Sequence, residues 1–260
     1  MDFLATAVRC VPSPFRSYGR KWIETRIRGI PRAMLKFKTA ELTQNLDFVL
    51  SHYRIEHPAV TYLQIGAFDG VQGDPVYPLI ARHKLQGVLL EPQKDAFVRL
   101  QANYGGFTGF HLINAAIADR DGQSTLYRIK AGAQGPDWLH QIASFDKNVI
   151  RGHAHMVPNL DSMIETETVH CMSFATLFDR VGLQTVDMLV IDTEGFDIEV
   201  LRLFDVPKRA PAIIRFEHKH LNTADYEESL EMLVHGGYRL TICGTDTLAY
   251  RNQVSSHFSV

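Results

Sequence analysis

The apolar positions of the chain alternate between helical and strand spacing from residue 40 onward. Spacings of three and four residues predict a helix before Pro58, and the β-branched and aromatic residues of 60–65 then predict a strand. Further strands are expected at 87–91, 111–116, 186–192 and 212–217. The helices between them are expected to include 95–103, one from the cap residue Ser173 to Gly182, and one that ends at Gly236.

Strands that alternate with helices and are almost continuously apolar are typical of a parallel sheet covered on both faces. The last two strand patterns, 238–242 and 247–250, flank a turn at 244–246 and predict an antiparallel hairpin. The fold class expected from the sequence is therefore a doubly wound, Rossmann-like α/β fold, whose sheet is mostly parallel and ends in that hairpin.

The length of the chain favours a single α/β domain, which we place at residues 41–260 after an extension at residues 1–40. Residues 131–168 show little periodicity and contain several glycines and prolines. We interpret them as an insertion over the carboxyl edge of the sheet that faces the substrate. Trp138 and Phe145 argue against complete disorder in this insertion.

Charge is distributed unevenly. The formal net charge is −2, but residues 1–38 hold nine Lys or Arg residues against Asp2 and Glu24, which makes this segment +7 and the remainder −9. Such a basic segment could dock on an anionic membrane surface or a phosphate-bearing substrate, or it could be a solvated helix packed against the acidic body. The acidic body argues against nucleic acid as the substrate.

Composition excludes several classes of protein. Apolar runs such as 188–191 are too short to span a bilayer, and the first nine residues do not have the pattern of a secretory signal. Cys10, Cys171 and Cys243 have no paired spacing, so neither a disulfide framework nor a zinc knuckle is expected. We therefore expect a cytoplasmic protein, with peripheral contact at the inner membrane face left open by the basic arm. These patterns do not decide the oligomeric state.

The turn after the first strand carries the first candidate chemistry. Glycines remove Cβ where a backbone must approach a ligand or adopt a positive φ. The dinucleotide fingerprint requires a glycine where this chain has Phe68, which disfavours the competing interpretation of a nicotinamide-dependent oxidoreductase. The candidate cofactor-binding residues of the loop are Gln64, Gly66, Ala67, Asp69 and Gly70.

Acidic residues mark the ends of three strands. Glu91 closes the second strand, where a carboxylate can accept hydrogen bonds from both ribose hydroxyls. Asp192 and Glu194 follow the fourth strand, while Glu217 and His218 close the fifth. Because the carboxyl ends of parallel strands share one edge, these side chains could converge on one substrate oxygen, with His218 or Asp192 as the base. The alternative is a set of helix-capping carboxylates beside a solvated loop.

A divalent cation could replace the base. The carboxylate oxygens of Asp192 and Glu217 suit Mg²⁺, and such an ion would acidify a substrate hydroxyl. The spaced pair His218 and His220 has no evident third ligand, so we interpret these residues as ordinary polar histidines rather than zinc ligands.

The chain also contains Asp74-Pro75, Asn103-Tyr104 and Asn114-Ala115-Ala116-Ile117. Together with 64–70, Glu91-Pro92 and 191–197, these segments resemble the FkbM family of methyltransferases in their order and spacing, over about residues 60–250. The resemblance implies transfer of a methyl group from S-adenosylmethionine to a hydroxyl, often on a sugar or a secondary metabolite. A small-molecule or glycan acceptor is therefore expected.

The resemblance further implies that Gly66, Asp69 and Glu91 contact the cofactor and that Ala116 and Ile117 lie near its adenine. One position departs from the common pattern, because many methyltransferases have an acidic residue where this chain has Gln64. An amide can still hydrogen-bond the amino group of the cofactor, but it supplies no compensating charge. A methyltransferase-like binding module without activity is the alternative that this departure leaves open.

Overall fold

The computed structural model describes residues 32–251, with side chains from residue 42 onward. Most of the basic segment, and with it the expected membrane contact, lies outside the described residues. Helix α3 (Arg32–Glu56) crosses the boundary that the sequence suggested at residue 40. No helix within residues 32–251 is long and apolar enough to cross a bilayer.

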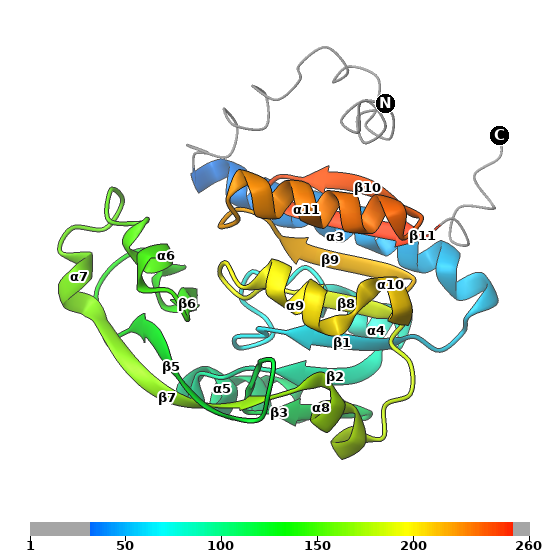
Figure 1. Ribbon diagram of the computed structural model, residues 1–260, viewed down its shortest axis with the longest axis horizontal. Coiled ribbons are helices and arrows are strands. Elements are labelled where there is room, and N and C mark those ends of the chain that lie inside the picture. The colour runs from blue at the N-terminus through cyan, green and yellow to red at the C-terminus, as the bar shows by residue number, and fades with distance from the viewer. Residues whose placement is uncertain (1–31, 252–260) are drawn as a thin grey trace, which may run out of the picture.

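A seven-stranded sheet forms the centre of the molecule (Figure 1). Its strands, in spatial order, are β10 (Tyr238–Cys243), β11 (Asp246–Arg251), β9 (Ile213–Glu217), β8 (Met188–Ile191), β1 (Thr61–Ile65), β2 (Gln86–Leu90) and β3 (Phe110–Ile113). All neighbouring pairs from β9 to β3 are parallel, and β11 pairs antiparallel with both β9 and β10. The expected hairpin is confirmed, and its second strand inserts between the first and the rest of the sheet.

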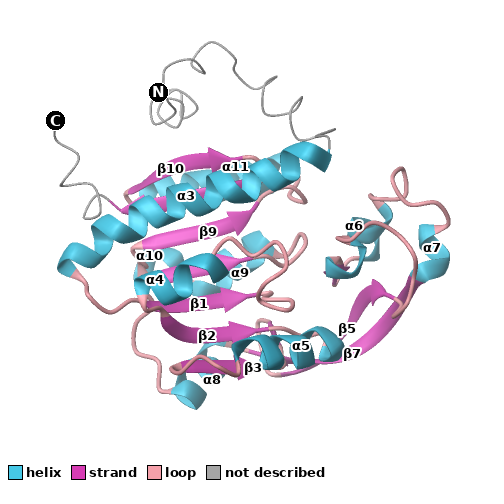
Figure 2. Ribbon diagram, turned by 180° about the vertical axis from the view of Figure 1, so that it is seen from behind, coloured by secondary structure: helices cyan, strands magenta, loops and turns pink. Residues whose placement is uncertain are grey.

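Helices cover both faces of this sheet. One face carries α8 (Phe174–Val181), α9 (Asp197–Phe204), α10 (Val206–Arg209) and α11 (Thr223–His235), as Figure 1 shows. Figure 2 shows the other face, covered by α3, α4 (Ile80–His83) and α5 (Lys94–Tyr104); the short 3-10 helix η2 (Tyr77–Leu79) leads into α4. The doubly wound arrangement expected from the sequence is thus confirmed.

The alternation of side chains along each strand divides the core into two layers. On β8, Met188 and Val190 pack with the apolar residues of α3, α4 and α5, whereas Leu189 and Ile191 pack with those of α8, α9 and α11. All four side chains are fully buried. Successive strand residues point to opposite faces, so a strand covered on both sides must be apolar at every position.

A second sheet of four strands lies beside the carboxyl edge of the first. Its strands, in spatial order, are β4 (Ala116–Ile117), β7 (Ile164–Met172), β5 (Gly122–Ile129) and β6 (Ala143–Ser144). The 3-10 helix η3 (Leu139–Gln141) and the helices α6 (Lys147–Arg151) and α7 (Leu160–Met163) connect them. Residues 131–168, expected as an irregular insertion, therefore hold strand and helix and share a small core that includes Leu139, Ile150 and Leu160.

One predicted strand is wrong in its extent. The pattern at 111–116 predicted one strand, but β3 ends at Ile113 and β4 begins at Ala116 in the other sheet. Between them, the side-chain amide of Asn114 donates hydrogen bonds to the carbonyl oxygens of Glu91 (2.8 Å) and Pro92 (3.0 Å). These long-range bonds hold the chain where it leaves the first sheet for the second.

Ion pairs of one buried arginine attach the second sheet to α5. Arg128 on β5 pairs with Asp95 on α5 (Nη1 to Oδ1, 2.7 Å) and with Glu167 on β7 (Nη1 to Oε2, 2.6 Å). The Arg128 side chain is only 8% exposed, and Glu165 lies beside it as a third carboxylate (Nε to Oε1, 3.5 Å), so several partners compensate the buried charge. This cluster fixes the position of β5 and β7 relative to α5.

The close contact of β1 and β2 gives a test of the sheet. A Cβ built on Gly87 would lie 1.7 Å from the carbonyl oxygen of Tyr62, and backbone cannot move aside as a side chain can. We expect Gly87→Ala to lower the free energy of unfolding by more than about 3 kcal/mol. Urea titration followed by circular dichroism measures this loss. Gly106→Ala is the matched control, since a Cβ there would meet no atom within 4 Å; equal stability of the two variants would contradict the described strand contact.

Candidate functional site

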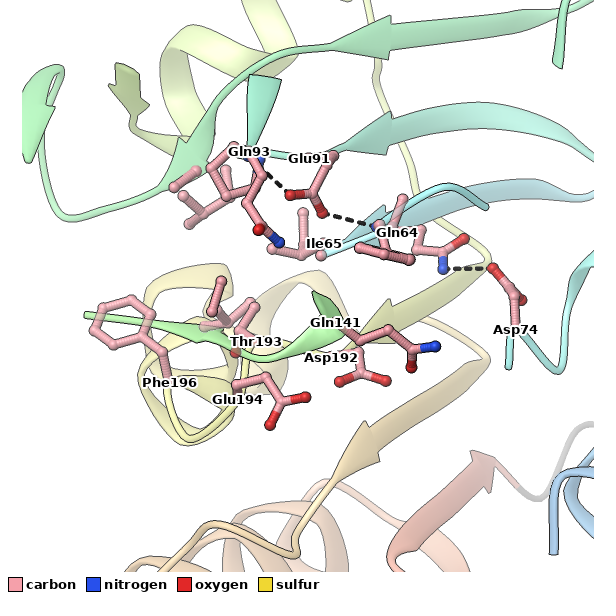
Figure 3. Close-up of a pocket in the computed structure, with 18 of the residues that line it drawn as sticks. Gln64, Ile65, Asp74, Glu91, Gln93, Gln141, Asp192, Thr193, Glu194 and Phe196 are labelled. Carbon is pink, nitrogen blue, oxygen red and sulfur yellow. Dashed lines mark hydrogen bonds between the residues drawn. The ribbon is translucent and has the colours of Figure 1, made fainter. Parts of the chain in front are cut away.

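A cleft opens where the loops after β1, β2 and β8 face the second sheet (Figure 3). Its empty volume, counted to where it opens into solvent, is about 920 Å³. The first sheet contributes most of its walls, and Leu126, Gln141, Ala143 and Phe145 line it from the second sheet. The position at the carboxyl ends of parallel strands is the usual ligand site of open α/β sheets.

The loop after β1 must have glycine at its first position. Gly66 has φ +79°, and a Cβ on it would lie 1.8 Å from the carbonyl oxygen of Asp192. The second glycine, Gly70, also has a positive φ, and a Cβ there would meet the rings and methyls of Tyr104 and Leu100 at 2.4 and 2.6 Å. The two glycines therefore let the loop pack against β8 and α5, and Gly66 does so while lining the cleft.

Both polar atoms of the Gln64 side chain are hydrogen-bonded at the wall of the cleft. Its Nε2 donates to Oδ2 of Asp74 (2.8 Å), and its Oε1 accepts from the hydroxyl of Tyr62 (2.8 Å). Asp74 also accepts from the backbone N–H groups of Val76 and Tyr77, and it lines the cleft. Burial raises the pKa of Asp74, although these hydrogen bonds oppose the effect. Gln64 thus places the carboxyl group of a residue ten positions later at the wall of the cleft.

Glu91 is buried at the end of β2, with 3% of its surface exposed. Its Oε2 accepts from the backbone N–H of Phe68 (2.7 Å), and its Oε1 accepts from the backbone N–H of Gln93 (2.8 Å). Burial raises the pKa of Glu91 to about 7 despite these two hydrogen bonds. The carboxyl group therefore ties the loop after β1 to the end of β2 at the wall of the cleft.

An apolar strip adjoins Glu91. Ala115, Ala116, Ile117 and Leu126 line the cleft and are each less than 9% exposed. They come from β4, the residue before it, and β5, so the strip forms only because the chain crosses between the two sheets after Ile113. A flat, apolar ring could lie against it without leaving a buried polar group unpaired.

Asp192 comes directly after β8 and forms an ion pair with a buried arginine. The guanidinium of Arg215, from β9, pairs through Nη1 with Oδ2 of Asp192 (3.0 Å) and donates to the carbonyl oxygen of Ile191 (3.0 Å). The same guanidinium pairs with Asp246 on β11. Burial raises the pKa of Asp192 to about 6, because the neighbouring Arg215 offsets only part of the desolvation. Asp192 and Arg215 both line the cleft.

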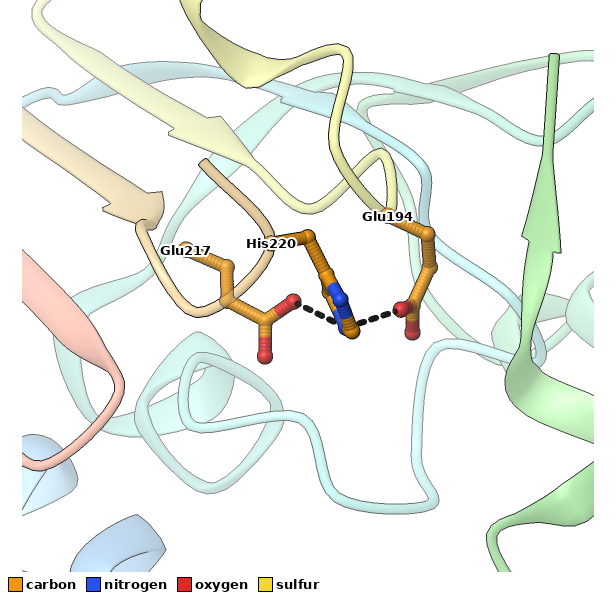
Figure 4. A group of neighbouring side chains, drawn as sticks. All are labelled: Glu194, Glu217 and His220. Carbon is orange, nitrogen blue, oxygen red and sulfur yellow. Dashed lines mark ion pairs between the residues drawn. The ribbon is translucent and has the colours of Figure 1, made fainter. Parts of the chain in front are cut away.

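Glu194, Glu217 and His220 form a separate group beside the cleft (Figure 4). Nε2 of His220 lies 2.8 Å from Oε2 of Glu194 and 3.6 Å from Oε2 of Glu217. Burial by itself would raise the pKa of Glu194, but the neighbouring His220 lowers it to about 2. Burial and the nearby carboxylates of Asp192 and Glu194 raise the pKa of Glu217. Only Glu194 of the three lines the cleft.

The structure brings most of the residues expected from the sequence to the cleft. Those that line it are Gln64, Gly66, Ala67, Glu91, Ala116, Ile117, Asp192 and Glu194. Asp69 is not among them: its Oδ1 accepts from the backbone N–H groups of Val71 and Gln72 and stabilises the turn. Gly70 packs under the loop instead of facing the cleft.

Glu217 and His218 are also absent from the cleft lining. Nδ1 of His218 lies 3.0 Å from Oγ1 of Thr247, and its ring stacks on Tyr226 with 4.5 Å between centroids. His218 is 3% exposed, so it belongs to the packing between β9, β11 and α11. The next histidine in the sequence, His220, lies two residues later and is the one that meets the carboxylates.

The structure groups the possible metal ligands differently from the pair Asp192 and Glu217 expected from the sequence. Within the described residues, the potential ligand atoms that gather within 4.8 Å of one another come from Glu194, Glu217 and His220. Asp192 is outside this group because Arg215 binds its carboxylate. The sequence analysis selected Glu217 but interpreted His220 as an ordinary polar histidine, because its spacing with His218 showed no third ligand.

Several cleft residues were not expected from the sequence, Asp74, Gln141, Phe145 and Arg215 among them. Asp74 stands in a segment noted only for its Asp-Pro dipeptide, and Gln141 and Phe145 come from the insertion, which has no recognisable motif. Phe145 packs edge-on against Phe196 with 5.6 Å between ring centroids. The positions of Gln141 and Phe145 depend on the docking of the second sheet, which no local pattern reveals.

Comparison with known proteins places this chain in a family. Residues 64–240 match the model of the methyltransferase FkbM domain, which covers more than half of the chain. The chain belongs to the FkbM methyltransferase family. The matched residues contain the whole cleft, from Gln64 on β1 to Arg215 on β9.

The individual proteins to which this chain is similar are distant. The chain is 26% identical to the 2-O-methyltransferase NoeI of Sinorhizobium fredii (strain NBRC 101917 / NGR234) over 148 residues, which are 56% of this chain and 58% of that protein. A solved methyltransferase FkbM from Methylobacillus flagellatus is 12% identical, with a TM-score of 0.47, over 74% of this chain and 44% of that one. A putative O-methyltransferase from Klebsiella pneumoniae is also 12% identical, with a TM-score of 0.38, over 89% and 94%. The first two matches span less than two thirds of each relative's length.

The raised pKa of Glu91 predicts how its charge affects stability. Folding raises this pKa from 4.5 to about 7, so the folded state retains a proton that the unfolded state releases. The stabilising effect is complete below about pH 4.5 and is lost as the pH rises through 7. The difference in unfolding free energy between wild type and Glu91→Gln should therefore fall by about 3 kcal/mol between about pH 4.5 and pH 8.

Urea titration across this pH range measures the difference, and a constant offset from altered hydrogen bonds does not affect its slope. Glu231→Gln, at an exposed position on α11, should give a flat difference. A flat difference for Glu91→Gln as well would contradict the assigned burial of the charge.

Proposed function

We propose that this chain transfers a methyl group from S-adenosylmethionine to a hydroxyl oxygen of a sugar or a secondary metabolite. Membership of the FkbM methyltransferase family supports the methyl transfer. Similarity to NoeI, a 2-O-methyltransferase, supports oxygen as the accepting atom. The observation that carries the proposal is the cleft itself, which is lined by the buried carboxyl group of Glu91, an apolar strip and the three further carboxyl groups of Asp74, Asp192 and Glu194.

The residues of the cleft fit this cofactor. Glu91 stands at the end of β2, where its carboxylate oxygens retain lone pairs for two ribose hydroxyls. The apolar strip of Ala115, Ala116, Ile117 and Leu126 would hold the adenine. Asp74 would face the ammonium group of the methionine part, with Gln64 fixing its orientation. We therefore assign to the Gln64–Asp74 pair the charge compensation that Gln64 lacks by itself, which argues against an inactive binding module.

S-adenosylmethionine, when bound, supplies an electrophilic methyl group on a sulfonium centre. The protein must then position a hydroxyl oxygen and accept its proton. We assign proton acceptance to Asp192, which lines the cleft with a pKa of about 6. Arg215 orients this carboxylate and keeps it ionised at neutral pH. His218, the other candidate from the sequence, is committed to Thr247 and Tyr226 behind the sheet edge.

The second sheet supplies the side of the cleft that we assign to the acceptor. Gln141 offers an amide for hydroxyl groups, and the edge-to-face pair of Phe145 and Phe196 offers an apolar surface. Amide and aromatic groups side by side suit a sugar ring, which has hydroxyls around its edge and C–H groups on its faces. The net charge of −9 outside residues 1–38 favours such an acceptor over a nucleic acid.

Incubation of the purified chain with methyl-labelled S-adenosylmethionine and a panel of mono- and oligosaccharides tests the proposal. We expect label to appear on a hydroxyl oxygen of a sugar, and mass spectrometry with fragmentation locates it. Calorimetry with S-adenosylmethionine and with NAD separates this function from an oxidoreductase. Binding of NAD without binding of S-adenosylmethionine would overturn the proposal.

Glu91→Gln should weaken binding of S-adenosylmethionine by about 10- to 100-fold, because hydrogen bonds to a charged acceptor are worth about 1.5–3 kcal/mol. Isothermal titration above about pH 8, where the wild-type carboxyl group is ionised, gives the clearest comparison. Glu231→Gln, a matched change on the exposed face of α11, should bind as wild type does. Unchanged affinity in Glu91→Gln would remove Glu91 from the cofactor site.

Asp192→Asn should lower kcat by about 10²- to 10⁴-fold, the usual contribution of a general base. Its affinity for S-adenosylmethionine should change little, because the amide keeps the size of the side chain. The wild-type rate should rise through about pH 6 as the carboxylate forms, and this limb should be missing from the variant. Asp161→Asn, at an exposed position on α7, serves as the control; a wild-type rate and pH profile in Asp192→Asn would exclude this base.

A further inference from the structure

Three side chains from two loops meet beside the cleft and carry a further inference. Glu194 lies in the loop after β8, Glu217 ends β9, and His220 follows three residues later. Figure 4 shows the imidazole of His220 between the two carboxyl groups. Nε2 of His220, Oε2 of Glu194 and Oε2 of Glu217 all lie within 4.8 Å of one another.

The facing atoms of this group are buried, close and not hydrogen-bonded. Each of the three atoms has less than 1 Å² of exposed surface and no hydrogen-bond partner. The contacts of His220 at 2.8 and 3.6 Å are short enough for ion pairs, yet the groups are not aligned as a donor and acceptor. Buried polar atoms of native proteins are almost always paired, so three such atoms facing one another indicate a missing partner.

The surrounding charges indicate that the partner is a cation. The carboxyl groups of Asp192, Glu194, Glu217 and Asp246 lie close enough to act on one another electrostatically. Arg215 pairs with Asp192 and Asp246, and Lys219 is the other nearby permanent cation. Carboxyl groups thus outnumber the permanent cations at this edge of the sheet, which favours a bound cation.

We propose that Glu194, Glu217 and His220 bind a divalent transition-metal ion. Ligand atoms around such an ion lie about 2.0–2.2 Å from it, which places them about 3.0–3.6 Å from one another, close to the two observed separations. Two carboxylate oxygens and one imidazole nitrogen suit Zn²⁺ or Mn²⁺ better than Mg²⁺, which prefers oxygen ligands alone. The site differs from the Asp192 and Glu217 pair expected from the sequence, because the carboxylate of Asp192 forms an ion pair with Arg215.

The second sheet helps to build this site. Oγ of Ser144 on β6 donates to the carbonyl oxygen of Glu194 (2.8 Å), and the ring of His153 lies 5.2 Å from that of His220. Glu194 adopts φ +49°, a left-handed conformation that is uncommon for residues other than glycine. Because Glu194 also lines the cleft, the ion would lie in the wall that we assign to the acceptor. Its binding by the free chain is independent of the proposed methyl transfer.

Titration of the full, chelator-treated chain with MnCl₂ and with ZnCl₂ in separate experiments tests the site. We expect one ion per chain by calorimetry and, for Mn²⁺, by loss of the free-ion signal in electron paramagnetic resonance. Glu217→Gln and His220→Ala should each weaken binding at least about tenfold, since even residues behind the ligands contribute that much. The matched controls Glu231→Gln and His155→Ala, at exposed positions, should bind as wild type does.

Thermal unfolding separates loss of the site from loss of the fold. Without metal, Glu217→Gln should melt no lower than wild type, because it removes one of the mutually repelling carboxylates. With a roughly hundredfold excess of metal over Kd, wild type should melt several degrees higher and the variant should not.

Failure of wild type to bind either ion would overturn the proposal. Equal binding by wild type and both ligand variants would place the ion elsewhere and would also overturn it. If Glu217→Gln does not fold, Glu194→Gln provides the same comparison. None of these outcomes depends on S-adenosylmethionine.

Discussion

The buried guanidinium of Arg215 makes the carboxyl edge of this sheet possible. It pairs with Asp192 and Asp246 and also binds the carbonyl oxygen of Ile191, so it connects β8, β9 and β11 at the level where the cleft opens. Buried carboxylates repel one another and lose hydration, and they stay ionised only beside a fixed cation. Without Arg215, the crowding of acidic groups at this edge would favour neutral carboxyl groups or an open, hydrated edge.

A second constraint is the docking of the four-stranded sheet on the first. Arg128 on β5 pairs with Asp95 on α5, Asn114 fixes the point where the chain crosses between the sheets, and Ser144 contacts the loop after β8. The cleft, the apolar strip and the Glu194, Glu217 and His220 group all lie where the two sheets meet. Small changes in docking would therefore affect the proposed cofactor, acceptor and metal sites together.

The sequence predicted the main sheet well because each buried strand carries its own apolar run. The cap at Ser173 and the left-handed glycine at Gly182 confined α8 to Phe174–Val181, as expected. The insertion was harder, since its strands are short or half exposed and its helices have four or five residues. Such elements are stabilised by their neighbours rather than by local propensity, so their own residues carry little periodic signal.

Sequence alone determined which strand ends carry the acidic residues, because the carboxyl ends of parallel strands must share one edge. It thereby identified Glu91, Asp192 and Glu194 as cleft residues. Only the tertiary structure decided which polar groups meet. Asp74 accepts a hydrogen bond from Gln64, His218 stacks on Tyr226, and His220 rather than His218 pairs with Glu194. The physical reason is that strand and helix periods are local properties of the chain. The partner of a buried polar group depends instead on which distant segment packs against it.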